Sequence, residues 1–304
     1  MALVARAWHA YRAVETAGEA LAIAERIGDP ELMGWALRVH VIACMQSGRY
    51  DTAATGATRI LSLVDRVEDP GDRETLIENT ALRVAAVTGR FDEARRFSDL
   101  VSDLVQDLTP HNRLHAAAYS VEIEELTANW DRIHELEPRV ERAVGDNRDT
   151  PCVRNARSLL VCALAETARG DHEHAQRFVE LASTVGVEGH DRELTAPRLR
   201  MALLRGDAAE AHRLVSDYGR PTLRFMFDMA GATAWLDAAA ALRLRSAVED
   251  EADFLSQPGT CLEPFALRAL GIVRGDRELV DRAGDRFAAL GLRWHEENTP
   301  PRFS

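Results

Sequence analysis

The sequence predicts an all-α fold, a right-handed α-solenoid of about seven antiparallel helix hairpins. Two series of residues support this prediction. Asp-Pro or Thr-Pro pairs recur at Pro30, Pro70, Pro110 and Pro151, which are 40, 40 and 41 residues apart. A capping residue followed by Pro is a common start of a helix. A turn sequence follows each Pro by about eighteen residues, so the two series stay in phase.

The turns share a small residue, Gly or Ala, followed two or three residues later by an acidic one. They are Gly48-Arg49-Tyr50-Asp51, Gly89-Arg90-Phe91-Asp92, Ala128-Asn129-Trp130-Asp131 and Gly170-Asp171-His172-Glu173. A Gly there can take the left-handed conformation that ends one helix, and the acidic residue suits the positive end of the next. Each unit is therefore predicted to be a helical hairpin.

The second helix of each hairpin has an apolar face. After the turn at Gly89, this face is formed by Phe91, Ala94, Ser98, Val101 and Val105, which recur at helical spacing. An Ala stands five residues after several turn glycines. These alanines are Ala53, Ala94, Ala175 and Ala211. Their small side chains are predicted to let the paired helices approach closely.

These marks define a repeat domain over residues 1–291 and a tail over 292–304. The expected units lie near 1–28, 29–68, 69–108, 109–149, 150–190, 191–219 and 220–291. Residues 2–28 are predicted to form one and a half helices without a starting cap, as in a chain that begins partway through a longer array. The tail is expected to cap the final helix before fraying.

Composition excludes several functions. All 37 basic residues are Arg, so a Schiff-base lysine, a pyridoxal phosphate anchor and a Walker A loop are ruled out. The net charge of -12 and the lack of a basic run argue against direct binding of nucleic acid.

No apolar run reaches the ~18 residues of a membrane span, and the start lacks a signal peptide. A cytoplasmic protein without membrane contact is therefore expected.

Two groups of residues have a structural explanation that is simpler than a chemical one. The cysteines stand singly, without zinc-ligand spacing, and are predicted to be packing residues; they are Cys44, Cys152, Cys162 and Cys261. The acidic run Glu249, Asp250, Glu251 and Asp253 contains an Asp-x-x-Asp pattern like that of terpene synthases. No second metal motif follows it and aromatic residues are few, so a solvated helix start is predicted.

A third group, His172, Glu173 and His174, stands at the predicted start of a helix. Residues two apart on a helix point to different sides, so the two imidazoles are not expected to share a metal ion. No catalytic residue, metal or cofactor is expected, and binding is favoured over enzymatic activity.

Three turn sequences resemble the central turn of tetratricopeptide repeats. They are Gly-Arg-Tyr-Asp-Thr-Ala (48–53), Gly-Arg-Phe-Asp-Glu-Ala (89–94) and Gly-Asp-Ala-Ala-Glu-Ala (206–211). Ile-Gly-Asp-Pro (27–30) and Arg-Phe-Ala-Ala-Leu-Gly-Leu-Arg-Trp-His (286–295) are similar to segments of large bacterial proteins, many of them actinobacterial. Those segments lie in the helical C-terminal regions of transcriptional regulators and cyclase-linked signalling proteins.

In an array of this kind the first helices line the concave face, which is the natural ligand surface. Counting back from each turn gives the candidate partner-binding residues Trp35, Arg38, Asn79, Arg83, Tyr119 and Glu122, with Thr80 and His115 beside them. Arg38, Asn79 and Arg83 could hold an acidic peptide or a C-terminal carboxylate, because guanidinium binds carboxylate through two parallel hydrogen bonds. Carboxylate clamps of the resembled family use Lys, Asn and Arg, and Lys is absent here.

The leading functional hypothesis is an interaction module that binds a protein or peptide partner in its concave groove, in regulation or signalling. The alternative is a sensing arm that binds a small effector and acts on a covalently linked domain of a transcriptional regulator, signalling ATPase or cyclase. A third hypothesis, an all-α enzyme, requires Glu249, Asp250 and Asp253 to face a closed cavity.

Overall fold

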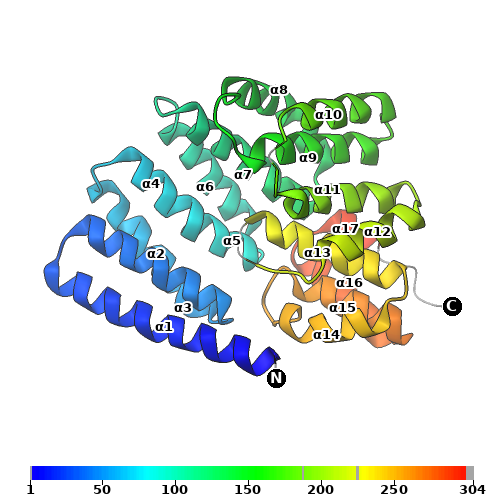
Figure 1. Cartoon of the computed structure of the whole chain (residues 1–304). Coiled ribbons are helices and arrows are strands. Elements are labelled where there is room, and N and C mark those ends of the chain that lie inside the picture. Colours follow the sequence, from blue (N-terminus) through cyan, green and yellow to red (C-terminus); the bar gives the residue numbers. More distant parts are fainter. Residues whose placement is uncertain (1, 187, 224–225, 299–304) are drawn as a thin grey trace. The chain divides into compact units, whose positions relative to one another are not determined.

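The computed structural model describes residues 2–186, 188–223 and 226–298, and gives the backbone alone for residues 2–12 (Figure 1). Within these ranges all regular structure is helical and no strand occurs, which confirms the predicted all-α class. The chain divides into two compact units, residues 1–116 and 117–304, with the boundary inside helix α7 (Pro110–Thr127). No described helix is both long enough and apolar enough to cross a bilayer.

Unit 1 consists of consecutive helices that pack in antiparallel pairs. In chain order they are α1 (Ala2–Ile27), α2 (Pro30–Gln46), α3 (Tyr50–Leu63), the 3₁₀ turn η1 (Val64–Arg66), α4 (Pro70–Leu76), the π-helical segment η2 (Ile77–Leu82), α5 (Arg83–Val87) and α6 (Phe91–Leu104). The first of them, α1, is one continuous helix, whereas one and a half helices were expected. It passes through Gly18, because a glycine costs a helix only about 1 kcal/mol and no Pro follows before its end.

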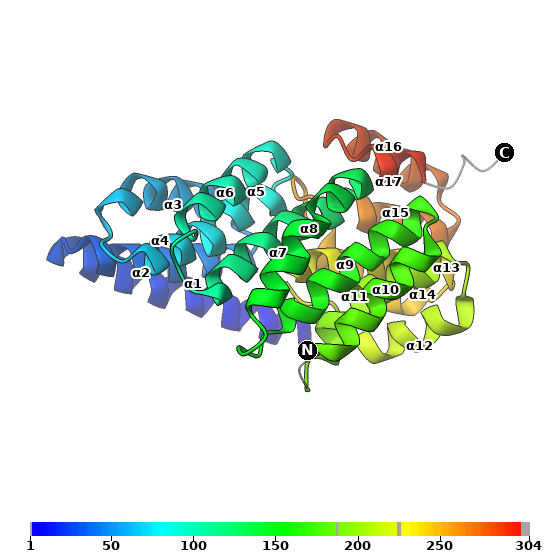
Figure 2. The same ribbon diagram turned by 90° about the horizontal axis from the view of Figure 1, so that it is seen from above.

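Unit 2 continues the same pattern from the second part of α7. Its other helices are α8 (Trp130–Asp146), α9 (Val153–Arg169), α10 (His172–Thr184), α11 (Asp191–Leu204), α12 (Ala208–Tyr218), α13 (Met226–Ala241), α14 (Arg245–Leu255), α15 (Glu263–Arg274), α16 (Arg277–Ala289) and α17 (Arg293–Glu297). Figure 2 shows α9, α10 and α11 side by side. The first helices of successive pairs contact one another, α9 with α11, α11 with α13 and α13 with α15.

Residues 220–291, expected as one unit, contain two helix pairs, α13 with α14 and α15 with α16. The turn between α13 and α14 has no Gly. Instead, Arg243 takes the left-handed conformation at a φ of 58°. Since an arginine rarely adopts this conformation, the sequence carries no signal for the turn.

The predicted turn glycines have the left-handed conformation. Gly48, Gly89, Gly170 and Gly206 have φ between 69° and 86°, and Ala128 takes their place in one turn at 55°. At each turn, an amide after the left-handed residue donates to a carbonyl five residues earlier, as from Arg49 to Cys44 at 2.9 Å. The alanines predicted to lie at close helix contacts, Ala53, Ala94, Ala175 and Ala211, are all buried. The same turn conformation is thus repeated along the chain.

The predicted helix starts at Pro30 and Pro70 are confirmed. The carboxylates of Asp29 and Asp69 accept hydrogen bonds from amides in the first turn, at 2.8 and 2.9 Å. The helix expected at Pro151 begins later, at Val153. Side-chain amides of Asn147 and Asn155 donate to the carbonyl of Thr150, which keeps this segment out of the helix.

Part of the predicted tail packs into unit 2 as α17. His295 is buried against Phe265 and Phe287, with ring centroids 4.6 and 5.7 Å away. Trp294 meets Trp130 edge to face at 5.4 Å. Burial of these rings holds residues 292–298 on the unit. The remaining residues of the expected tail, 299–304, lie outside the described residues.

The close contact between α15 and α16 gives a stability prediction. A Cβ atom on Gly271 would lie 2.6 Å from Val280 Cγ2 and 2.8 Å from the carbonyl oxygen of Asp276. We expect Gly271→Ala to lower the free energy of unfolding by about 1–3 kcal/mol, because the backbones must move apart. Thermal and urea denaturation measure the change.

Gly284→Ala on α16 is the matched control, because a Cβ atom there meets nothing within 4 Å. It should raise stability by up to about 1 kcal/mol through its higher helix propensity. If both variants behaved alike, the close approach at Gly271 would be contradicted.

Candidate functional site

Two of the predicted partner-binding residues, Trp35 and Arg38, lie together on α2. The Arg38 guanidinium lies over the indole of Trp35, 5.1 Å from its centroid. The indole Nε1 donates to Asp72 Oδ2 at 3.4 Å. Both side chains are partly exposed, and Arg38 makes no ion pair with any residue that the structure describes. This pair could therefore receive a ligand.

Asn79 and Arg83 are less accessible than expected. Asn79 Nδ2 donates to Glu78 Oε1 at 2.7 Å and to the carbonyl of Thr75 at 3.2 Å, while Arg83 is buried. The expectation that Arg83 faces a groove is wrong, because all five residues of α5 are buried and no face of this helix is open to solvent. The π-helical segment η2 precedes Arg83 and contains Asn79, so its extra residue per turn rotates the face of Asn79 relative to α5.

Tyr119 and Glu122 are buried in unit 2, so they do not form an exposed surface as expected. Glu122 Oε1 accepts from Arg154 Nε at 3.1 Å, and the Arg154 guanidinium lies 4.6 Å from the Tyr119 ring centroid. Arg154 belongs to α9, the first helix of the following hairpin, which covers both residues. Its guanidinium gives the buried Glu122 carboxylate the partner that a buried charge requires. Of the six predicted residues, Trp35, Arg38 and Asn79 keep exposed surface, and their contact with a partner stays a prediction.

The acidic run lies in the middle of α14, and not at a helix start as expected, because the helix begins at Arg245. Glu249 pairs with Arg245 at 3.2 Å and with Arg274 at 2.8 Å. Asp250 and Asp253 are exposed. The arrangement required by the enzyme hypothesis, three carboxylates facing a closed cavity, is therefore not present.

The cysteines behave as predicted packing residues. Cys44, Cys162 and Cys261 are buried and Cys152 is partly buried. Burial raises the pKa of the Cys261 thiol to about 12, and it also raises the pKa of Cys162. These two thiols therefore stay protonated and unreactive at neutral pH.

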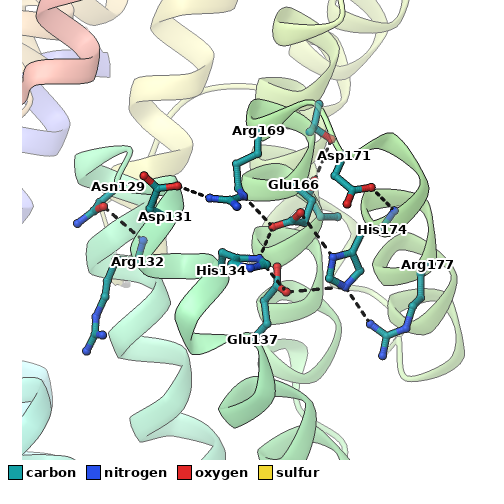
Figure 3. A network of polar contacts seen from close by, with 12 residues as sticks. Asn129, Asp131, Arg132, His134, Glu137, Glu166, Arg169, Asp171, His174 and Arg177 are labelled. Atoms are coloured by element: carbon teal, nitrogen blue, oxygen red, sulfur yellow. Dashed lines mark hydrogen bonds and ion pairs between the residues drawn. The ribbon is translucent and has the colours of Figure 1, made fainter.

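Four side chains from three consecutive helices of unit 2 point toward one another (Figure 3). They are His134 and Glu137 of α8, Glu166 of α9 and His174 of α10. One nitrogen or oxygen atom from each lies within 4.8 Å of those of the other three. His134 Nδ1 is 2.8 Å from Glu166 Oε1 and 3.4 Å from Glu137 Oε2. His174 Nδ1 is 3.5 Å from Glu166 Oε2, and its Nε2 is 3.8 Å from Glu137 Oε2. We call this group the His-Glu cluster.

Local structure explains why these residues meet. His134 and Glu137 are three apart on α8, so they share a face of that helix. Glu166 lies in the last turn of α9 and His174 in the first turn of α10, on either side of the left-handed turn at Gly170. Asp171 caps α10 by accepting from the His174 amide at 3.0 Å. The hairpin turn therefore sets the position of His174 relative to Glu166.

The carboxylates of the His-Glu cluster are buried, whereas its imidazoles reach solvent. The side chains of His134 and His174 are 43% and 30% exposed, compared with 6% for Glu137 and 2% for Glu166. Burial raises the pKa of Glu137 to about 8, and the neighbouring Glu166 carboxylate contributes to this rise. Arg169 Nε lies 3.4 Å from Glu166 Oε1 and partly balances its charge.

The sequence alone does not predict this cluster, although it contains His174. The expectation that His172 and His174 point to different sides agrees with the structure, in which His172 is exposed and His174 faces the cluster. The partners of His174 come from other helices. A spacing of 32 residues separates His134 from Glu166, so recognising the site requires the pairing of successive hairpins. The only local signal is the His134-x-x-Glu137 spacing.

Unit 1 contains a second buried pair of carboxylates, Glu74 and Glu78, beside His115. Asn112 Nδ2 donates to Glu74 Oε2 at 3.4 Å, and His115 Nδ1 lies 3.8 Å from Glu78 Oε2. Burial is the main cause that raises the pKa of Glu74 to about 8, and the Glu78 carboxylate adds to it. Glu74 is therefore expected to carry a proton near neutral pH.

Comparisons with known proteins do not assign a family to this arrangement. Neither a scan against family models nor a search of curated proteins finds a match to the sequence. The resemblance of the turns to tetratricopeptide repeats stays a prediction.

The raised pKa of Glu74 predicts how stability depends on pH. The folded state favours the protonated form, so this stability is complete below the ordinary pKa of 4.5 and is lost as the pH rises toward about 8. Replacing Glu74 by Gln removes the ionisation. We expect the stability of Glu74→Gln relative to wild type to increase between about pH 5 and about pH 8 in urea denaturation.

Glu19→Gln on α1 is the control, because Glu19 is exposed. Its stability relative to wild type should be nearly constant over the same pH range. Parallel pH profiles for Glu74→Gln and wild type would contradict the assignment of a buried, protonated Glu74.

Proposed function

We propose that this protein is an interaction module, a right-handed solenoid of about seven helix hairpins similar to tetratricopeptide repeats, which binds peptide segments of partner proteins. Contacts between side chains one repeat apart support the solenoid. Trp35 of α2 bonds to Asp72 of α4 across 37 residues, and Arg200 of α11 pairs with Asp237 of α13 across 37 residues. Each contact joins two successive first helices, as in stacked repeats.

The observation that carries the binding function is an exposed face of α2. Leu32, Trp35, Arg38 and Val39 stand at helical spacing on one side of this helix. Leu32 is 43% exposed and Val39 is 51% exposed. A single exposed apolar residue is ordinary, but apolar residues grouped with Trp and Arg are typical of binding surfaces. We call these four residues the α2 face.

The α2 face favours a partner segment that combines apolar residues with a carboxylate. Stacking on Trp35 orients the planar guanidinium of the partly exposed Arg38, and a guanidinium can bind a carboxylate through two parallel hydrogen bonds. Arg38 Nε is buried without a hydrogen-bond partner among the described residues. Leu32 and Val39 offer apolar contacts on the same face. The proposed ligand is therefore an acidic side chain or C-terminal carboxylate within an apolar peptide.

The alternative, a sensor of small effectors, is supported by two cavities in unit 2. One of about 200 Å³ is lined by residues of α8, α9 and α10, among them Glu141, Leu159 and Arg177. The other, of about 400 Å³, is lined by Arg148, Pro151, Asn155 and residues 184–186, and its volume lies in the range of about 300–1,000 Å³ that is common for drug-sized ligands. Arg177 already pairs with Glu141 at 2.5 Å. We favour the interaction module because the α2 face combines exposed apolar side chains with an arginine that makes no ion pair among the residues the structure describes.

The experiment is a selection from a random peptide library displayed on phage, with the full chain as target and Arg38→Ala as counter-target. We expect the enriched peptides to share an acidic residue or a free C-terminus flanked by apolar residues. Fluorescence anisotropy should show that Trp35→Ala and Arg38→Ala each weaken binding by at least about tenfold, as for residues central to an interface.

Arg213→Ala is the matched control, because Arg213 is exposed on α12 and belongs to unit 2. It should bind the selected peptides as wild type does. Thermal unfolding of all variants checks that they remain folded. Enrichment without acidic residues, or equal binding by wild type and Arg38→Ala, would refute this function.

A further inference from the structure

We propose that the His-Glu cluster of unit 2, formed by His134, Glu137, Glu166 and His174, is a binding site for a divalent transition-metal ion of the zinc class. The site would join α8, α9 and α10. It is independent of the α2 face, which lies in unit 1, so each proposal can fail without the other.

The spacing of the donor atoms suits a four-coordinate ion. With bonds of about 2.0–2.2 Å, neighbouring ligands of a tetrahedral zinc ion lie roughly 3.3–3.6 Å apart. His134 Nδ1 and Glu137 Oε2 are 3.4 Å apart, and His174 Nδ1 and Glu166 Oε2 are 3.5 Å apart. The four donors already lie within 4.8 Å of one another. His134 Nδ1 and Glu166 Oε1 are 2.8 Å apart, so side-chain rotations that separate these two atoms would complete the geometry.

An unpartnered buried carboxylate oxygen gives a second, independent reason. Glu137 is 5% exposed, and its Oε1 has no hydrogen-bond partner in the part of the chain that the structure describes. Buried polar atoms normally have partners, because losing water without a replacement costs about 1–3 kcal/mol. Glu137 also lies beside the Glu166 carboxylate, which makes ionisation of both unfavourable. A divalent cation between the two carboxylates would offset their repulsion, and one bound by both oxygens of Glu137 would also give Oε1 a partner.

The arginines around the cluster do not displace the cation. Arg169 lies near Glu166 but also pairs with Asp131. Arg177 lies 3.3 Å from His174 Nε2 but also pairs with Glu141. The cluster and its surroundings thus contain four carboxylates and two guanidinium groups. The carboxylates are those of Glu137, Glu166, Asp131 and Glu141. When all four are ionised, an excess of two negative charges remains. This excess matches a divalent ion.

The donor set indicates the class of metal. Two imidazole nitrogens and two carboxylate oxygens, without a thiolate, are ligands that zinc and other borderline ions accept, whereas Mg²⁺ and Ca²⁺ prefer oxygen alone. Four protein ligands leave no open position, which is typical of structural zinc sites. The partly exposed imidazoles offer an entry path from solvent. Binding would therefore lock three helices together and stabilise unit 2.

The test is isothermal titration of the chelator-treated, dialysed full chain with Zn²⁺, supported by the absorption spectrum with Co²⁺. We expect one ion to bind at the His-Glu cluster, with a rise in Tm on addition of metal. His134→Ala with His174→Ala should reduce affinity by at least about tenfold and remove the rise in Tm. Glu137→Gln, which keeps the shape of the side chain, should also weaken binding and serves if the double variant does not fold.

Two controls identify the site. His172→Ala removes an exposed imidazole at the start of α10 and should keep wild-type affinity. His115→Ala disrupts the second carboxylate cluster, in unit 1, and should also keep it. The proposal is overturned if wild type binds no stoichiometric Zn²⁺, if Glu137→Gln and the double variant bind it unchanged, or if only His115→Ala loses it.

Discussion

The packing of each hairpin against the next one is the constraint on which the rest of the structure depends. Two short helices cannot bury their apolar faces against each other alone, so successive first helices must pack together. In unit 2 this contact runs from α9 to α11, α13 and α15. Polar residues caught in the contact are paired across one repeat, as Arg200 with Asp237 at 3.0 Å. The repeated left-handed turn makes this stacking possible because it returns each second helix to the same side.

The same constraint decides which side chains are available to ligands. First helices that contact both neighbours bury their charged residues, as Glu122 is covered by Arg154. On α2 of unit 1, Leu32 and Val39 stay exposed, and Arg38 stacks on Trp35 without an ion pair among the described residues. Between second helices, imidazoles can reach both solvent and the buried carboxylates beneath them. The His-Glu cluster lies at such a place.

Features of the fold that depend on a few neighbouring residues could be predicted from the sequence. The caps Asp29 and Asp69 and the turn glycines act within a single turn of chain, so their residue types reveal them. The left-handed Arg243 and the π-helical segment η2 could not be predicted, because packing imposes them on residues without a local preference. The burial of Arg83 could not be predicted either, because neighbouring helices cover every residue of α5.

The candidate site was less accessible to sequence analysis for a related reason. His174 was noticed, but its partners lie one repeat earlier in the chain or across a turn, at distances that vary between hairpins. Between successive first helices, the contact of Glu122 with Arg154 spans 32 residues, whereas that of Trp35 with Asp72 spans 37. Because this spacing is not constant, spacing alone cannot show which residues meet. Only the packing of α8, α9 and α10 brings the four ligands together.

X-ray absorption spectroscopy of the zinc-loaded full chain tests most directly whether hairpin packing builds a metal site from three consecutive helices. We expect nitrogen and oxygen neighbours at about 2.0–2.2 Å, with the scattering pattern of two imidazoles and no sulfur. A sulfur shell at about 2.3 Å, or a spectrum without imidazole, would contradict it, because the ion would then be held by residues other than His134, Glu137, Glu166 and His174.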